Sequence, residues 1–264
     1  MSPVSASGRL PGGRWSERGA AYAVSREHVD GPSLPRLLVL ADPRPGDRCL
    51  DVGTGAGHTA ARLAEAGAEV VALDPAAGML DAACRRYGTL PGLRFVEAPG
   101  DATGLPDGAF DVVTARHTLH HHTDPTATLR EIARVLRPGG RFVLVDEITP
   151  DPRVEGWLDA VSRARDATHV RAHTLDAWRA MLADAGFRWV TGDGHTRYRM
   201  EVEAWIGRMD LEAPERAEVR RLFRAAGALE RRLFDIEYDG GEAVRFALPM
   251  AVVLAVLPAE GEKT

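Results

Sequence analysis

The chain has 264 residues, of which 45% are hydrophobic and 27% charged, and its formal net charge at pH 7 is −5. This length suits one α/β domain with an elaboration, and the net negative charge disfavours a nucleic-acid partner, whose binding site normally appears as a basic stripe. Its two cysteines indicate no disulfide framework, the N-terminus lacks a signal-peptide pattern, and the longest apolar run, 247–257, is too short to cross a bilayer. We therefore expect a cytoplasmic protein with no nucleic-acid or membrane partner.

The N-terminal region divides into two parts before the regular pattern of the chain begins. Residues 1–14 are rich in Ser, Gly and Pro without apolar periodicity, so we expect them to be disordered. Residues 15–41 are predicted to form short helices that are broken at Gly31-Pro32 and at Pro35. From 48 to about 148, strands and helices alternate, which predicts a doubly wound, mostly parallel sheet with helices on both faces. Ligands of such sheets bind beyond the carboxyl ends of the strands.

The first strand ends in a glycine turn: residues 49–57 read Cys-Leu-Asp-Val-Gly-Thr-Gly-Ala-Gly. Glycine lets the backbone approach a ligand closely, and the first N–H groups of the next helix have no intrahelical partner. The third glycine comes one residue earlier than in the G-x-G-x-x-G turn of dinucleotide-binding proteins. A carboxylate at the strand end would repel a phosphate and attract an ammonium group. The turn therefore disfavours a pyrophosphate ligand, and its candidate ligand contacts are Asp51, Gly53, Thr54, Gly55 and Gly57.

The second strand, 70–74, ends in Asp74, about 20 residues beyond the turn, where an acidic residue is placed to hydrogen-bond a ribose diol. A ligand with a ribose, a purine and an amino-acid tail but no phosphate is S-adenosylmethionine (SAM). A third strand, 93–96, leads to Gly100-Asp101-Ala102, and a fourth, 110–116, leads to His120-His121. Residues 129–142 then read as a helix, a turn and a fifth strand.

In this order and spacing, the motifs resemble the class I SAM-dependent methyltransferases, specifically the type 11 methyltransferase domains, over roughly residues 20–190. The resemblance implies a seven-stranded Rossmann-like sheet whose last strand, 244–257, is antiparallel. It also implies a lid and SAM-binding core at 15–150, and cap helices with the last two strands at 151–264. The chain would be a monomer or a homodimer. Cofactor contacts are expected at Asp51, Gly53, Thr54, Gly55, Gly57, Asp74, Pro75, Met79, Gly100, Asp101, Ala102 and Arg116, with Asp101 facing the adenine amino group.

Histidines gather directly after the fourth strand, where residues 116–122 read Arg-His-Thr-Leu-His-His-His. Methyl transfer is an in-line displacement that depends on alignment, and an oxygen or carbon acceptor of high pKa must also lose a proton, for which histidine is the usual base. The candidate bases are His121 first and His169 second, followed by His117 and His120. The alternative is that the histidine pair at 120–121 is a generic family feature that packs beside the cofactor.

An alternative hypothesis is that the same loop binds a metal, because four histidines within six residues could supply imidazole ligands. The loop lacks the ligand spacing of a zinc site and a suitably placed carboxylate. Asp124 followed by Pro125 instead indicates the start of a helix. We therefore expect no metal and metal-independent catalysis.

The region after residue 150 predicts a partial cap. It comprises helices at 154–165 and 174–184, a strand at 187–198, and a charged helix at 217–234 whose Glu and Arg residues mark a solvated face. The segment 165–171 either faces the site or forms an N-cap network for the helix after Thr174. The tryptophans could line an acceptor pocket, but we favour a role in the cap's own core for Trp157, Trp178, Trp189 and Trp205.

The pattern as a whole indicates a SAM-dependent methyltransferase that acts on a small organic molecule, with O- or C-methylation ahead of N-methylation. A fold does not fix its reaction. The alternatives are therefore a SAM-binding enzyme that catalyses a cyclisation or a decarboxylation, and a non-catalytic SAM-binding subunit.

Overall fold

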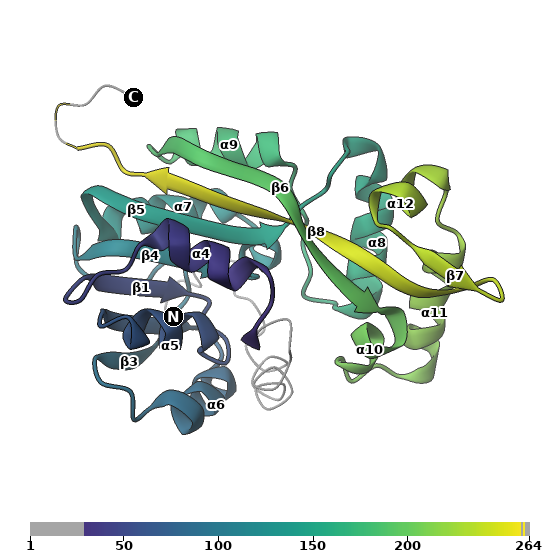
Figure 1. The fold of residues 1–264 in the computed structure, drawn as a ribbon, viewed down its shortest axis with the longest axis horizontal. Helices are drawn as coiled ribbons and strands as arrows, with labels where there is room; N and C mark the ends of the chain where they lie inside the picture. The colour runs from purple at the N-terminus through teal and green to yellow at the C-terminus, as the bar shows by residue number, and fades with distance from the viewer. Residues whose placement is uncertain (1–28, 260, 262–264) are drawn as a thin grey trace, which may run out of the picture.

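The computed structural model describes residues 29–259 and 261, so the predictions for residues 1–14 and for helices before residue 29 lie outside the described chain. Its centre is an eight-stranded sheet with helices on both sides (Figure 1). The elements are α4 (Ser33–Ala41), β1 (Arg48–Val52), α5 (His58–Glu65), β2 (Glu69–Asp74), α6 (Ala77–Tyr87), β3 (Leu93–Glu97), β4 (Phe110–Arg116), the 3₁₀ turn η1 (Leu119–His121), α7 (Pro125–Val135), β5 (Leu136–Glu147), the 3₁₀ turn η2 (Pro152–Val154), α8 (Glu155–Arg165), α9 (Leu175–Asp184), β6 (Arg188–Glu201), α10 (Val202–Gly207), α11 (Ala213–Arg224), α12 (Ala228–Leu233), β7 (Glu237–Asp239) and β8 (Glu242–Val256).

The sheet confirms the expected topology. Its strand order is β3-β2-β1-β4-β5-β8-β6, and β1 to β5 are parallel to one another, as the β1 pairings of Leu50 with Val71 and with Val113 show. The last long strand, β8, is antiparallel both to β5 and to β6. This path has the seven strands that were predicted, and an eighth, the short β7, pairs with β8 outside it.

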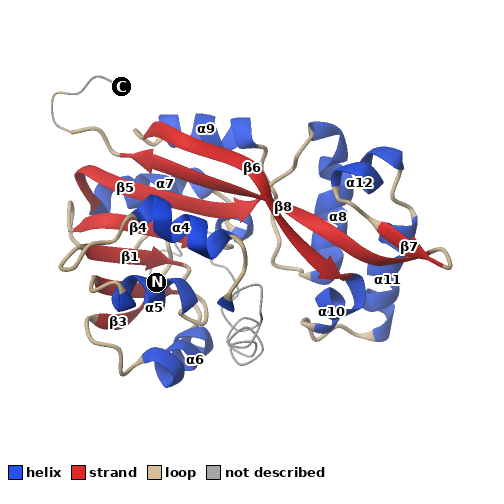
Figure 2. Ribbon diagram, viewed as in Figure 1, coloured by secondary structure: helices blue, strands red, loops and turns tan. Residues whose placement is uncertain are grey.

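Helices cover both faces of the sheet because the strands are apolar on both sides (Figure 2). Leu37 of α4 and Leu63 of α5 pack with one face of the central strands. Leu129 of α7 and Trp178 of α9 belong to the cluster on the opposite face. Among the described residues, no helix has both the length and the apolar character needed to cross a membrane.

A separate hydrophobic cluster forms the core of the cap. β6 and β8, with 14 and 15 residues, continue beyond the central sheet and carry α8, α10, α11, α12 and β7 around their far ends (Figure 1). The cap core is aromatic: Phe223 meets Trp157, Trp205 and Phe246 edge to face, with ring centroids 5.1 to 6.1 Å apart. Trp157 packs partly buried against the cap core, as expected, whereas Trp178 is fully buried in the core of the main sheet and not of the cap. Trp189 packs partly buried against the main core, and Trp205 lies in the cap core while also lining the pocket described below.

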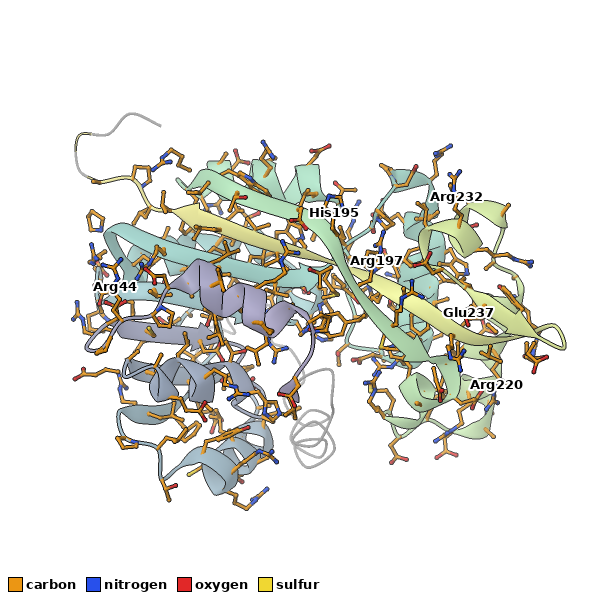
Figure 3. The ribbon with its side chains drawn as sticks, in the orientation of Figure 1. Arg44, His195, Arg197, Arg220, Arg232 and Glu237 are labelled. Atoms are coloured by element: carbon orange, nitrogen blue, oxygen red, sulfur yellow. The ribbon has the colours of Figure 1, made fainter. Side chains whose placement is uncertain are left out.

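The predicted single helix at 217–234 is wrong, because the chain forms two helices, α11 and α12, separated by residues 225–227. In one continuous helix, Phe223 and Phe234 would lie about 16 Å apart along the axis. The break lets both rings contact Trp157, at centroid distances of 5.7 and 4.9 Å. The outer face of α11 is solvated as expected, since Arg220 there forms an exposed ion pair with Glu203 of α10 (Figure 3).

We expect Phe223→Ala to lower the free energy of unfolding by about 3–5 kcal/mol, because it removes a fully buried ring from the centre of the cap. Urea denaturation followed by circular dichroism measures the change. Val39→Ala is the matched control, since the Val39 side chain is 77% exposed and its truncation leaves no cavity. A loss for Phe223→Ala no larger than that of the control would show that the cap core contributes little to stability.

Candidate active site

The glycine turn after β1 has the backbone geometry that its sequence requires. Gly53, Gly55 and Gly57 have φ angles of +64°, +53° and +83°, in the left-handed region that disfavours other residues. A Cβ atom on Gly53 would lie 2.2 Å from the Thr118 hydroxyl oxygen, so the turn touches the histidine loop directly. At Gly55, by contrast, an added Cβ would meet no atom of the described chain within 4 Å. The turn therefore packs against the loop at one glycine and faces open space at another.

Two buried carboxylates fix this turn. Asp51 accepts hydrogen bonds of 2.7 Å from the hydroxyls of Thr54 and Thr114, and burial raises its pKa. Asp74 accepts from the backbone N–H groups of Gly55, at 2.8 Å, and Ala76, at 2.9 Å. Burial raises the pKa of Asp74 to about 6, against the opposing effect of these two hydrogen bonds. Each carboxylate oxygen can accept more than one hydrogen bond, so Asp74 retains acceptor capacity toward the pocket that it lines.

One pocket of about 1000 Å³ joins the residues that the sequence singled out at separate strand ends. All four candidate histidines line it. Gly57 does not; it begins α5, and an added Cβ there would lie 2.9 Å from Ala83 Cβ, so this glycine permits close packing of α5 against α6. The cofactor candidates that line the pocket are Asp51, Gly53, Thr54, Gly55, Asp74, Pro75, Met79, Gly100, Asp101, Ala102 and Arg116.

The histidine loop is shaped by contacts with β5 and β6. His117 has a φ of +57°, its backbone N–H donates to the Val145 carbonyl, and its Nε2 lies 3.2 Å from the Tyr198 hydroxyl. His120 uses both its backbone N–H, at 3.0 Å, and its Nδ1, at 2.5 Å, to contact the carboxylate of Asp146. Burial favours neutral His120, but the charges of Asp146 and Glu147 outweigh it and raise the pKa of this imidazole.

His121 lies beside His120 in a different electrostatic environment. Its Nδ1 is 3.2 Å from the Thr168 carbonyl oxygen, and because a carbonyl only accepts, Nδ1 carries the hydrogen and Nε2 the lone pair. Burial, followed by the neighbouring charge of His120, lowers the pKa of His121 to about 3. The ring is therefore neutral throughout the physiological range.

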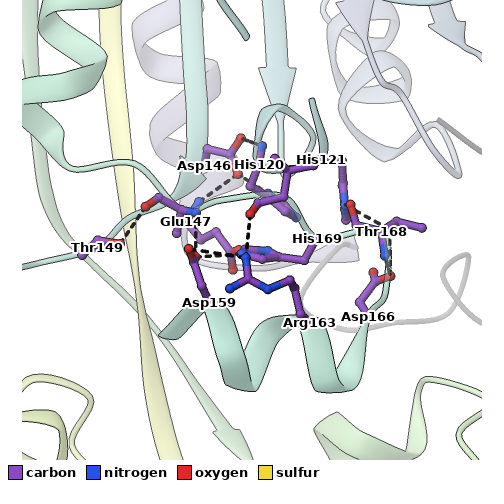
Figure 4. A network of polar contacts seen from close by, with 12 residues as sticks. His120, His121, Asp146, Glu147, Thr149, Asp159, Arg163, Asp166, Thr168 and His169 are labelled. Atoms are coloured by element: carbon purple, nitrogen blue, oxygen red, sulfur yellow. Dashed lines mark hydrogen bonds and ion pairs between the residues drawn. The ribbon is translucent and has the colours of Figure 1, made fainter. Parts of the chain in front are cut away.

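His169 has both ring nitrogens next to carboxylates (Figure 4). Nδ1 lies 2.9 Å from Glu147 and Nε2 lies 3.1 Å from Asp159. Burial favours the neutral ring, but these two carboxylates outweigh it and raise the pKa of His169 to about 9. Without a further ligand the ring is a cation at neutral pH, which is not the protonation state of a base.

The carboxylates around these histidines were missed in the sequence. Asp146 and Glu147 end β5, so the strand-end rule that identified Asp51 and Asp74 could have found them. Asp159 lies inside α8, where nothing in the pattern distinguishes it from a surface acid. A metal site was weighed only within residues 117–122, whereas the structure groups potential ligand atoms from three segments, all within 4.8 Å of one another, in His120, Glu147 and His169.

Both interpretations of the segment 165–171 have a counterpart in the structure. Asp166 and His169 line the pocket, so the segment faces the site. Thr174 separately caps α9 by accepting a 3.1 Å hydrogen bond from the Ala177 N–H. The predicted start of α7 is also confirmed, because the Asp124 side chain accepts from the Ala127 N–H.

Comparisons with known proteins place this fold and site in a family. A model of the methyltransferase domain matches residues 50–144. The methyltransferase YcgJ of Bacillus subtilis (strain 168) is 33% identical over 172 residues, which are 64% of this chain and 68% of YcgJ. The YcgJ crystal structure superposes with a TM-score of 0.79 at 28% identity, covering 87% of this chain and 99% of that one.

Two further relatives agree. The structure of a putative methyltransferase from Bacillus halodurans C-125 gives a TM-score of 0.81 at 26% identity, over 87% of this chain and all of that one. A demethylmenaquinone methyltransferase of Clavibacter sepedonicus is 44% identical over 125 residues, 46% of this chain and 50% of that protein. The fold and site define a class I SAM-dependent methyltransferase. Within that class, the chain belongs to the type 11 methyltransferase domain family, and SAM is its cofactor.

Proposed function

We propose that this enzyme methylates an oxygen or carbon atom of a small organic molecule. The observation that supports this proposal is the continuous pocket of about 1000 Å³, which extends from the glycine turn to the buried polar cluster beneath the cap. Small-molecule sites span about 300–1,000 Å³, so this pocket is large enough for a cofactor and an acceptor together. The relative named for demethylmenaquinone is consistent with a small acceptor.

The residues at the sheet end of the pocket fit SAM, which supplies an electrophilic methyl group on a sulfonium. The open space at Gly55 lets a ligand approach the backbone of the turn. In this proposal Asp74 accepts from the ribose hydroxyls, and the negative charge of Asp51 favours the ammonium group of the amino-acid tail. The other predicted contacts that line this end are Pro75, Met79, Gly100, Asp101, Ala102 and Arg116.

Cofactor affinity should depend on pH through Asp74. The ribose hydroxyls need the carboxylate form as acceptor, and the pKa of Asp74 is about 6. We therefore expect the affinity for S-adenosylhomocysteine to be full above pH 7 and to fall as the pH drops through 6. Isothermal titration calorimetry between pH 5 and 8 measures this change. Asp74→Asn should weaken binding by about 2 kcal/mol at pH 7.5 and abolish the pH dependence; a variant that keeps the wild-type profile would remove Asp74 from the ribose site.

The acceptor end of the pocket combines an apolar wall with the polar cluster. The wall comes from β6, α10 and β8, through Met200, Trp205 and Met250, and it excludes water from the acceptor. In this proposal His121 is the general base, because it lines the pocket and its tautomer places the ring lone pair on Nε2. We assign no base role to His169, whose two nitrogens both contact carboxylates.

Replacing His121 should affect turnover more than binding. We expect His121→Ala to lower kcat by roughly 100-fold while the Kd for S-adenosylhomocysteine changes less than threefold, since loss of a general base costs about 10²–10⁴ in rate. His195→Ala is the control, because His195 is an exposed histidine on β6 outside the pocket lining (Figure 3). If cofactor affinity falls in step with kcat, His121 is a wall of the cofactor site and not a base.

The proposed reaction is tested with SAM that carries a deuterated methyl group. The enzyme is incubated with a panel of phenols, enols, quinols and amines, and the products are analysed by mass spectrometry. We expect the label on an oxygen or carbon atom of one acceptor class, with one S-adenosylhomocysteine formed per label. Transfer to amines alone would reject the O/C assignment. A product that forms without label or S-adenosylhomocysteine would instead indicate a cyclisation or decarboxylation.

A further inference from the structure

The polar cluster at the acceptor end has the composition and arrangement of a metal site. The ligand atoms of His120, Glu147 and His169 lie within 4.8 Å of one another and come from η1, the end of β5 and the segment after α8. Bonds of about 2.0–2.2 Å from nitrogen or oxygen to a divalent ion place ligand atoms about 3–4 Å apart. A closing movement of about 1 Å therefore brings all three within bonding distance of one ion.

Each histidine is oriented for this role by a carboxylate on its other nitrogen. His120 Nδ1 contacts Asp146 at 2.5 Å, which leaves Nε2 for an ion. His169 Nε2 contacts Asp159 at 3.1 Å, which leaves Nδ1. A metal-bound histidine almost always donates its second N–H to such a partner, which fixes the tautomer and the ring orientation. Two such pairs lie beside Glu147, and this is the partner arrangement that metal-bound histidines usually have (Figure 4).

Glu147 supplies the second observation. Its Oε1 is buried and makes no hydrogen bond of normal geometry to any described residue, although His169 Nδ1 is only 2.9 Å away. Its negative charge is therefore offset by the neighbouring His169 ring rather than by a well-aligned hydrogen bond. An ion between the two side chains would use the lone pairs of both atoms.

The local charge also favours a cation. Asp146, Glu147 and Asp159 place three carboxylates around only two imidazoles, and the nearest arginine partner of Asp159, Arg163, is 3.6 Å away and half exposed. A divalent ion would offset the excess negative charge that the cluster carries when its histidines are neutral ligands.

We propose that His120, Glu147 and His169 bind one divalent first-row transition metal ion, with an open coordination position toward the pocket. Two imidazoles and one carboxylate are a ligand set typical of catalytic zinc and non-haem iron sites, which keep such positions open. All three residues line the acceptor end of the pocket. Resting on the proposed function, the open position would bind the ionisable oxygen of a phenolic or enolic acceptor and lower its pKa. This proposal replaces the expectation of metal-independent catalysis that the loop spacing alone suggested.

Cobalt titration tests the site directly. The full chain, stripped with a chelator and dialysed, is titrated with Co²⁺ while its visible d–d absorption is recorded, and Zn²⁺ competition gives the affinity for zinc. We expect saturation at one Co²⁺ per chain and displacement by Zn²⁺. Acetohydroxamate, an oxygen-donor probe, should then shift the cobalt spectrum. Absence of saturable Co²⁺ binding would overturn the proposal, and a spectrum unchanged by acetohydroxamate would overturn the open position.

Variants distinguish a metal site from a cluster of ion pairs. Glu147→Gln and His120→Ala should weaken Co²⁺ binding at least 10-fold, and Asp146→Asn and Asp159→Asn, which alter only the orienting partners, by about 10–100-fold. Co²⁺ should raise the Tm of the wild type but not that of Glu147→Gln. Wild-type affinity in these variants would show that the cluster is not the site.

The test includes two control variants, and conservative variants replace any variant that does not fold. His122→Ala and His195→Ala should bind Co²⁺ as the wild type does, because one is a loop histidine outside the triad and the other is exposed on β6. If His120→Ala does not fold by circular dichroism, the conservative Glu147→Gln and Asp159→Asn decide. None of these readouts involves SAM or methyl transfer. Failure of metal binding therefore leaves the proposed function standing, and a failed transfer assay leaves the metal site standing.

Discussion

The structure depends on hydrogen bonds to aspartates that are buried where the parallel strands end. Asp51 accepts hydrogen bonds from two threonine hydroxyls, and Asp74 accepts from two backbone N–H groups. Both buried carboxylates therefore have hydrogen-bond donors. Asp146 is held by the side chain and backbone of His120. Apart from Thr114, which lies in β4, these donors come from turns and loops that follow the strands, so the carboxylates also hold the conformation of those turns. The turns that line the pocket are therefore held in place by hydrogen bonds to buried aspartates.

The cap is joined to this edge by β6 and β8, which belong to both parts of the molecule. The two strands pair from Val256 at the far end of the sheet to Arg245 within the cap, with only local irregularities. Tyr198 on β6 shows the consequence, since its hydroxyl lies 2.7 Å from Ser33 Oγ and 3.2 Å from His117 Nε2. One side chain thus joins the start of α4, the histidine loop and the cap side of the pocket. The apolar wall of the pocket is consequently positioned by the same strands that complete the sheet.

Much of this architecture could be predicted from the sequence, because it follows from local rules. The glycine turn, the acidic strand ends and the caps at Asp124 and Thr174 each depend on neighbouring residues, and the structure has them as expected. The helix break at 225–227 could not be predicted, because it serves contacts between Phe234 and rings distant in sequence. The same holds for Asp159, whose pairing with His169 depends on how α8 packs.

Close packing and backbone hydrogen bonds join the glycine turn and the histidine loop into one unit. Gly53 has no side chain, and its place is filled by Thr118, the residue that precedes η1. Within η1, the His120 carbonyl accepts from the backbone N–H groups of Val170 and Arg171, so the loop is also fixed to the segment that carries His169. The glycine turn, Thr118 and η1 are therefore in continuous contact as far as His120. The glycine turn and the polar cluster around His120 are in this way joined through packing contacts and hydrogen bonds that no single motif contains.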